Sequence, residues 1–324
     1  MVKAIQVHKV GGAEQLTLGE VTLPPPGPGE VRVRNEAAGL NFIDIYFRTG
    51  LYPAPSMPFI PGGEAAGTIV AVGPDVKRFR VGDRVAYVAS LGCYAQERNV
   101  PAPMLVRLPD GISSKQAAGM MLKGLTVQYL IRQTWKLKAG ETILVHAAAG
   151  GVGQILVQWA KHIGATVIGT VGDKDKAKLV RKLGCDHVIL YRDEDFVAKV
   201  REITGGKLCD VVYDGVGKAT FPGSLDCLRP RGLFVSFGNA SGAIEAFNIG
   251  TLSQKGSLFA TRPTLNTHTA DPKNLARMAR DLFAVVQSGA VKIPVARTWK
   301  LEEAADAHRA LEGRQTTGTA VLLP

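Results

Sequence analysis

Cysteine is scarce in this sequence, and long apolar runs are missing. Its four cysteines are Cys93, Cys185, Cys209 and Cys227. They form no C-x-x-C pair and no dense framework, which argues against a disulfide scaffold and against a cysteine-rich zinc site, and favours reduced thiols in the cytoplasm. No stretch is apolar enough to span a membrane, because even Ile155–Val171 is interrupted by Lys161 and His162. The start, Met1–Val10, alternates like a strand and has no signal-peptide core.

Acidic residues are too few to balance the basic ones, so the net charge is +11 and the pI is near 9.6. The excess favours an anionic partner, either a small molecule or a nucleic acid. The lysines and arginines are scattered, and no aromatic residues interleave with them, which argues against a nucleic-acid surface. The densest run, Asp173–Lys182, also contains acids at helical spacing. It indicates a solvated helix face, with a phosphate contact near its start as the alternative.

The first third of the chain reads as short strands separated by turns, which is typical of an antiparallel barrel. The strands are expected at 3–8, 30–38, 65–73 and 83–89. A helix is expected over Ser113–Gln133, with Gly124 as a possible break. The last residues return to short elements, a strand at 295–301, a helix at 302–313 and a strand at 317–324.

Between these segments, strands and helices alternate. Strands are expected at 142–147, 165–171, 186–191, 209–216, 232–238 and 257–262, and helices at 152–163, 175–183, 195–204, 221–228 and 274–289. Repeated βα units predict a doubly wound parallel sheet with helices on both faces. The fold class is therefore α/β, with a β-barrel domain formed by 1–122 and 296–324 and a Rossmann domain formed by 123–295. A ligand cleft is expected between them.

A glycine cluster lies at one strand-to-helix junction, within Leu144–Gln154. Ala147, Gly150 and Gly153 give the spacing A-x-x-G-x-x-G between an apolar strand and an amphipathic helix. Small residues there let the backbone approach a pyrophosphate at the helix N-terminus. The context is the one that a dinucleotide-binding motif requires.

The choice between NAD and NADP is made at the end of the next strand, near Val171. Asp173 lies about 20 residues beyond Gly153, which suggests NAD. Asp173 could instead be an ordinary acid at a helix N-terminus, and Lys176 could reach a 2′-phosphate. These residues alone leave both cofactors open, with a slight preference for NADP.

Several motifs, in order and over the whole chain, resemble those of one enzyme family. They are GLNFIDIYFRTGLY from Gly39, PGGEAAGTIVAVG from Pro61, HAAAGGVG from His146, VVYDGVG from Val211 and CLRPRGLFVSFGNASG from Cys227. The chain resembles NADPH-dependent quinone oxidoreductases, the zeta-crystallin-like branch of the medium-chain dehydrogenase/reductase superfamily. The resemblance implies a GroES-like barrel domain interrupted by a Rossmann domain.

The resemblance also implies a cofactor site for NADPH. Lys176, Tyr191 and Arg314 would gather around the adenosine 2′-phosphate, although each could also be an ordinary surface residue. The pyrophosphate would lie on Gly150, Gly151 and Val152, and Gly172 would contact the cofactor at the end of its strand. The residues that would line the nicotinamide side are Asn41, Thr126, Phe237, Gly238 and Asn239.

Related zinc alcohol dehydrogenases carry metal ligands that this chain lacks. They have cysteine where it has Asn41, histidine where it has Gly63 and a second cysteine near Lys123. None of these three residues can supply a thiolate or an imidazole, and the single carboxylate of Glu64 is not a site. We therefore expect no metal. Without a Lewis acid an alcohol is hard to oxidise, whereas a quinone is already electron-poor.

The expected reaction is transfer of a hydride or electrons from NADPH to a small quinone. The polar groups assigned to the substrate are Asn41, Tyr46, Tyr52 and Lys123, although either tyrosine could be a packing residue. Rival functions are reduction of activated double bonds, as in 2-alkenals, and a non-enzymatic RNA-binding role. Gly256–Pro263 reads as an apolar edge strand, which predicts a homodimer.

Overall fold

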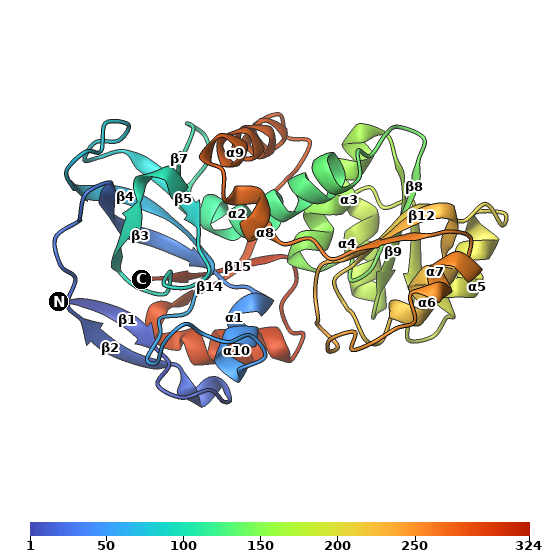
Figure 1. The fold of residues 1–324 in the computed structure, drawn as a ribbon, viewed down its shortest axis with the longest axis horizontal. Helices are drawn as coiled ribbons and strands as arrows, with labels where there is room; N and C mark the ends of the chain where they lie inside the picture. Colours follow the sequence, from blue (N-terminus) through green and yellow to red (C-terminus); the bar gives the residue numbers. More distant parts are fainter. The chain divides into compact units, whose positions relative to one another are not determined.

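The computed structural model describes residues 1–324, and the chain divides into two compact units (Figure 1). The first unit consists of Met1–Leu125, His268–Gln287 and Ile293–Pro324, and the second of Thr126–Thr267 and Ser288–Lys292. This division differs from the predicted domain boundaries mainly at 268–287, which the sequence grouped with the second domain. No helix is both long and apolar enough to cross a bilayer.

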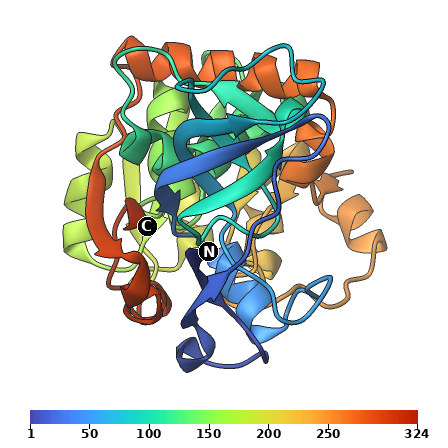
Figure 2. The ribbon, with the colours of Figure 1, turned by 90° about the vertical axis from the view of Figure 1, so that its left-hand side faces the viewer.

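Antiparallel strands build most of the first unit (Figure 2). Its strands are β1 (Val2–Gln6), β2 (Thr17–Val21), β3 (Glu30–Gly39), β4 (Glu64–Val72), β5 (Arg84–Val88), β6 (Glu97–Pro101), β7 (Leu105–Arg107), β14 (Val295–Lys300) and β15 (Thr319–Leu323). A seven-stranded sheet has the order β14-β15-β3-β4-β5-β7, with β6 also paired to β3. Strand β15 thus lies between β14 and β3, although β3 is far from β15 in the sequence.

Three helices lie wholly within this unit. They are α1 (Phe42–Thr49), α9 (Pro272–Gln287) and α10 (Ala304–Glu312), and short 3-10 turns are present at Ala13–Gln15, Ala102–Met104 and Leu301–Glu303. Helix α1 was not predicted. It follows β3 directly and ends at Gly50, whose φ of 82° is the left-handed conformation that glycine adopts without strain.

The second unit is the predicted doubly wound α/β fold, and the predicted fold class is confirmed. Its strands β8 (Thr142–Val145), β9 (Thr166–Val171), β10 (His187–Leu190), β11 (Cys209–Asp214), β12 (Leu228–Ser236) and β13 (Phe259–Thr261) pair in parallel in the order β10-β9-β8-β11-β12-β13. Its helices are α3 (Gly151–Ile163), α4 (Lys174–Lys182), α5 (Phe196–Ile203), α6 (Phe221–Asp226) and the unpredicted α7 (Gly250–Gln254). Another short helix, α8 (Leu265–Thr269), follows β13.

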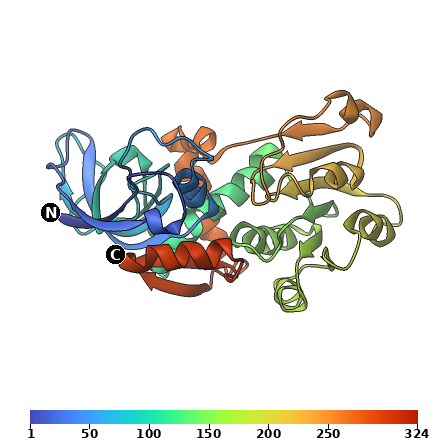
Figure 3. The same ribbon diagram turned by 90° about the horizontal axis from the view of Figure 1, so that it is seen from below.

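Apolar residues on both faces of this sheet are buried. Leu144, Ile168 and Val212 belong to one core cluster with Val200 of α5, while the alternating residues Ile143, Val167 and Val211 are equally buried. Helices α3 and α4 pack on β8–β10, and α5 and α6 on β10–β12 (Figure 3). A parallel sheet covered on both faces leaves only its strand ends for binding.

The expected break at Gly124 is wrong. Helix α2 (Ser114–Tyr129) runs through Gly124 and continues as a π-helical turn, Leu130–Thr134. A Cβ at Gly124 would lie 2.5 Å from Leu282 Cδ1, so the glycine allows α9 to approach and does not end the helix.

Candidate functional site

Asn41 lies between β3 and α1 and begins the helix. Its backbone N–H donates to Asp44 Oδ2 at 2.9 Å, so the side chain of Asp44 satisfies one of the amides at the helix start. The Asn41 side chain completes this capping box with the backbone of Asp44, and its Nδ2 donates to Glu64 Oε1 at 2.9 Å. Asn41 is 6% exposed, and these contacts hold it in one orientation.

Glu64, at the start of β4, is the centre of this group. It is completely buried and accepts hydrogen bonds from Asn41 Nδ2, from Lys123 Nζ at 2.8 Å and from Leu122 N at 2.7 Å. A Cβ at Gly39 would lie 2.2 Å from Glu64 Oε1, so only glycine leaves room for the carboxylate. A buried charge is stable only when it is paired and hydrogen-bonded. The structure thus brings the predicted residues Asn41 and Lys123 together through a third residue that the prediction set aside.

A second buried chain of polar contacts starts at Asp44. Tyr94 Oη donates to Asp44 Oδ2 at 2.9 Å and lies 3.2 Å from His308 Nε2. Burial raises the pKa of Asp44 to about 7, against the opposing effects of Tyr94 and Asn41. Its other oxygen, Oδ1, is buried without a partner.

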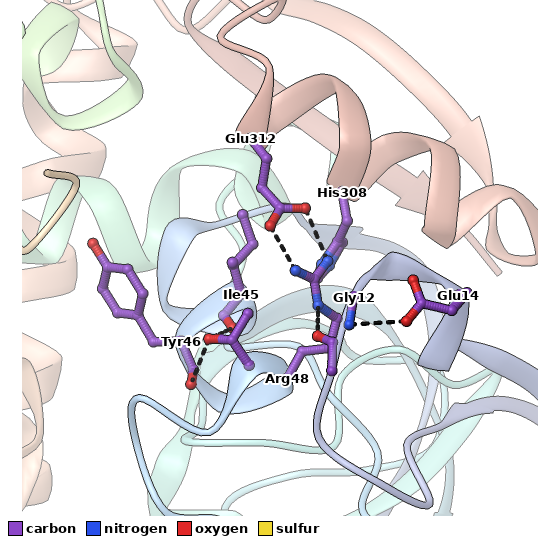
Figure 4. Close-up of polar contacts among 9 residues, drawn as sticks. Gly12, Glu14, Ile45, Tyr46, Arg48, His308 and Glu312 are labelled. Carbon is purple, nitrogen blue, oxygen red and sulfur yellow. Dashed lines mark hydrogen bonds and ion pairs between the residues drawn. The ribbon is translucent and has the colours of Figure 1, made fainter. Parts of the chain in front are cut away.

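The last residue in this series of polar contacts is Arg48, which is almost fully buried. Arg48 Nη1 lies 3.3 Å from His308 Nδ1, and the guanidinium makes a two-pronged ion pair with Glu312 at 3.0 and 2.6 Å (Figure 4). Burial, and then the Arg48 charge, lower the pKa of His308 to about 3, so the imidazole is neutral. Since Arg48 can only donate, Nδ1 accepts and Nε2–H points to Tyr94. These contacts tie α10 to α1.

Tyr46 and Tyr52 form an aromatic pair at the end of α1. Their ring centroids are 5.2 Å apart in an edge-on arrangement, and Phe47 packs edge-on against Tyr52 at 5.8 Å. In Figure 4 the Tyr46 ring points away from the Arg48–His308 contacts. Both tyrosines are half-buried, which agrees with packing residues and leaves their assigned contact with substrate a prediction.

In the second unit, the glycine loop between β8 and α3 fits a dinucleotide. Gly150 begins α3 without any side-chain cap, so the first N–H groups of the helix are available to an anion. A Cβ at Gly153 would lie 2.5 Å from Ala147 O, which explains the need for glycine where the helix approaches the strand. Ala147 itself has a φ of 52°, a strained conformation of the kind found at binding sites. Gly151 and Val152 therefore present backbone donors at the carboxyl edge of the sheet, whereas the Gly150 N–H donates to Ala147 O at 2.9 Å.

The loop at Phe237, Gly238 and Asn239 follows β12 at the same edge. A Cβ at Gly238 would lie 2.4 Å from Gly215 O, so two loops pack backbone against backbone. Arg262, which the sequence analysis missed, donates to Gly238 O at 3.0 Å and to Ser236 Oγ at 2.9 Å. Asp214 caps the neighbouring loop through the backbone N–H groups of 216 and 217 at 2.8 and 3.0 Å. Thr126 is buried in this unit as a hydrogen-bond partner of Tyr129.

The ends of β9 and β10 form a third cluster. Strand β9 ends at Val171, as expected, and Asp173 is the N-cap of α4, accepting from Lys176 N at 2.8 Å. The Lys176 Nζ lies 3.2 Å from Asp173 Oδ2. Tyr191 is next to Gly172, because a Cβ there would lie 2.9 Å from its hydroxyl. Arg314 belongs to the first unit, just after α10, where it is exposed with a φ of 56°.

No group of three or more His, Cys, Asp or Glu residues that could hold a metal ion occurs in the structure. The residues that the sequence analysis missed or set aside are Asp44, Glu64, Arg192 and Arg262. Three of them could have been found from the sequence. Glu64 follows the Pro61–Gly63 turn at the start of a strand, and Arg192 is next to the predicted residue Tyr191. Asp44 had a local signal in its capping-box spacing from Asn41, whereas Arg262 had none, because its partners Ser236 and Gly238 are distant in sequence.

Comparison with known proteins covers the whole chain. Residues 27–173 match the family model "Alcohol dehydrogenase GroES-like domain" and residues 151–277 match "Zinc-binding dehydrogenase". The chain is 53% identical to a quinone oxidoreductase of Pseudomonas aeruginosa and 48% identical to a 2-haloacrylate reductase of a Burkholderia species, over 100% of the chain and 100% and 99% of those proteins. The crystal structure of Escherichia coli quinone oxidoreductase complexed with NADPH superposes with a TM-score of 0.98 at 49% identity, covering 99% of this chain and 100% of that one. The chain therefore belongs to the quinone oxidoreductase family, the zeta-crystallin-like branch of the medium-chain dehydrogenase/reductase superfamily.

Proposed function

We propose that this protein is an NADPH-dependent quinone oxidoreductase that works without zinc. The observation that carries the proposal is full-length similarity, 53%, 50% and 49% identity, to three curated quinone oxidoreductases. The uncapped start of α3 and the lysine at the start of α4 are the features that such a cofactor needs.

NADPH, when bound, supplies the hydride. The residues of the chain bind and orient it. The backbone N–H groups of Gly151 and Val152 would hold the pyrophosphate, and Gly150, whose own N–H donates to Ala147 O, would let the ligand approach the backbone. Phe237, Gly238, Asn239 and Thr126 would border the nicotinamide, and Gly172, Lys176, Tyr191 and Arg314 the adenosine 2′-phosphate. Asp214 and Arg262 fix the loops that carry these groups.

On the acceptor side, we assign polarisation of the quinone oxygen to the group around Glu64. Lys123 carries a buried ammonium, and Asn41 an amide, that both donate to Glu64 Oε1. Each retains further hydrogens for an oxygen on which negative charge develops. Tyr46 and Tyr52 would pack against a flat apolar acceptor.

A second candidate function is reduction of an activated carbon–carbon double bond. The 48% identity to a 2-haloacrylate reductase is close to the identity to the quinone oxidoreductases, so sequence similarity alone separates the two poorly. Both acceptors are electron-poor and need no metal.

The experiment is an NADPH-consumption assay with benzoquinone, naphthoquinone, 2-chloroacrylate, a 2-alkenal and, in reverse, ethanol with NADP⁺. We expect quinones to give the highest kcat/KM and ethanol to give no turnover. The kcat/KM with NADPH should exceed that with NADH by at least about tenfold, equivalent to about 1.4 kcal/mol. Faster turnover of 2-chloroacrylate would favour the second candidate. No consumption with any acceptor would contradict both.

A matched pair of variants tests the assignment of Lys123. Lys123→Met should lower kcat for quinone while NADPH binding changes little. Lys115→Met, which removes an exposed lysine from the same helix, should leave both unchanged. Equal losses in the two variants would contradict the assignment.

Three further properties belong to this proposal. Elemental analysis should find no stoichiometric zinc, because Asn41, Gly63 and Lys123 stand where a metal site would need thiolates and an imidazole. We place the protein in the cytoplasm, since its four cysteines are buried and unpaired. We also propose a homodimer paired through β13, an edge strand on which Phe259 is 54% exposed.

A further inference from the structure

Lys176, the lysine assigned to the 2′-phosphate, is already paired with an aspartate, Asp173. Asp173 Oδ1 accepts from Lys176 N at 2.8 Å, and Asp173 Oδ2 lies 3.2 Å from Lys176 Nζ. Both side chains are partly exposed, 42% and 24%, so the pair is open to an incoming ligand. The carboxylate thus takes the place at the start of α4 where an external anion would also be favoured.

A second cation faces the same point from the end of β10. Arg192 Nε would lie 3.4 Å from a Cβ on Gly172, next to the Tyr191 hydroxyl at 2.9 Å. Arg192 is exposed. The backbone N–H of Lys176, and then the charges of Lys176 and Arg192, hold the pKa of Asp173 below its usual range. Two cations and one anion therefore surround Gly172.

These charges act in opposite directions on a cofactor. A 2′-phosphate brings about two negative charges beside Asp173, which repels it, and beside Lys176 and Arg192, which attract it. The 2′-hydroxyl of NADH has no charge, and a carboxylate at this place can accept its hydrogen bond. Asp173 therefore lowers the preference for NADPH, and Arg192 raises it.

We propose that Asp173 and Arg192 are opposing specificity residues of the adenosine site: Asp173 is a built-in competing anion that limits the affinity for NADPH, and Arg192 is a phosphate-binding cation that offsets it. The inference rests on the proposed function, because it concerns the cofactor named there. It predicts that the charge of Asp173 can be removed with a gain in NADPH affinity.

The test is a binding measurement on the full chain, without substrate. NADPH and NADH are titrated by nucleotide fluorescence, and 2′,5′-ADP and 5′-AMP by calorimetry. Asp173→Ser is the main variant, because serine retains an N-cap oxygen for Lys176 N and removes only the charge. Asp175→Ser is the matched control, since Asp175 is on the same helix turn but its side chain is 92% exposed and paired with Lys178.

We expect Asp173→Ser to bind NADPH and 2′,5′-ADP roughly fivefold more tightly at low salt, as for charges several ångströms apart in water, and the gain to shrink at high salt. NADH and 5′-AMP affinities should stay the same or fall. Asp175→Ser should change none of them by more than about twofold.

Arg192→Gln is the complementary variant. It should weaken NADPH and 2′,5′-ADP by roughly tenfold, the loss of one charge-assisted contact, and leave NADH unchanged. Arg201→Gln, an exposed arginine of α5, is its control. A purely structural role of Arg192 would lower the affinities for both cofactors equally.

These measurements distinguish an error in the proposed cofactor from an error in the roles of Asp173 and Arg192. If the wild-type protein binds neither NADPH nor 2′,5′-ADP, the proposed cofactor is wrong and this inference with it. If the wild type binds NADPH and Asp173→Ser binds it no more tightly, or Arg192→Gln no more weakly, only the opposing roles of these two residues are refuted.

Discussion

Replacing Asp44 by asparagine should change how the stability of the first unit depends on pH. Burial raises the pKa of Asp44 from 3.8 to about 7. Between these values the folded unit holds the proton and the unfolded chain releases it, so stability falls as pH rises through this window and is constant above it. A shift of about 3 units at 1.36 kcal/mol per unit corresponds to about 4 kcal/mol.

The shifted pKa of His308 makes the stability of this unit depend on pH in the opposite direction, over almost the same pH range. Its pKa falls from 6.5 to about 3 in the fold, so the unfolded chain binds a proton below pH 6.5 that the folded unit refuses. Stability therefore falls as pH drops from 6.5 towards 3. In the wild type the folded unit carries one proton on Asp44 and the unfolded chain one on His308, so between about pH 4 and 6.5 the two slopes cancel.

Asp44→Asn removes only one of these slopes. Its carbonyl oxygen can accept from Tyr94 and Asn41, as Oδ2 does. The gain in stability should reach about 4 kcal/mol above pH 7 and shrink to about 2 kcal/mol at pH 5, where the acid slope of His308 becomes visible. Amide hydrogen exchange of β3 and β4, corrected for intrinsic rates, measures the opening free energy of this unit.

The control is Asp75→Asn, since Asp75 is exposed in a turn at a φ of 66°, a conformation that asparagine also tolerates. It should leave the pH profile unchanged. A profile of Asp44→Asn that runs parallel to the wild type at every pH would show that Asp44 does not hold a proton in the fold, and the reasoning would fail.

Three other predictions concern the remaining contacts. Glu64→Gln should cost about 3 kcal/mol of stability by leaving the Lys123 ammonium buried without a counter-charge. Thermal melting should show that the double variant with Lys123→Met recovers part of this loss. Fully additive effects of the two substitutions would contradict an interaction between Glu64 and Lys123. Tyr52→Ala should raise KM for naphthoquinone while the Kd for NADPH stays within about twofold, and steady-state kinetics with a parallel NADPH titration would reveal the opposite split. Phe259→Lys should convert the expected dimer into a monomer by light scattering at micromolar concentration; a monomeric wild type would refute the proposed pairing of β13.

The second unit could be predicted well because its signals are local. The end of β9 at Val171 and the N-cap Asp173 follow from apolar runs and capping preferences within a few residues. In the first unit, by contrast, Gly124 misled the prediction, because glycine weakens an isolated helix, and only the structure shows Leu282 packed against it.

The buried contacts of the first unit could not be predicted. Arg48 and Glu312 are 264 positions apart in sequence, and Asp44 and Tyr94 are 50 apart. Periodicity describes each element but not which elements meet, so a partner for Arg48 or a buried Asp44 had no local signature. Glu64 was visible as a residue, but its three donors come from two other segments of the chain.

The position of β15 has a consequence for synthesis on the ribosome. This strand is made after the other strands described here, yet Val321 and Leu322 pair with Gly39 and Ala38, two and three residues before Asn41. Until they emerge, the second half of β3 presents an unpaired edge, while the contiguous strands of the second unit are already complete. The nascent chain thus carries a complete parallel sheet and an incomplete barrel, and the end of β3 that leads to Asn41 acquires its last pairing only after residues 319–323 have been made.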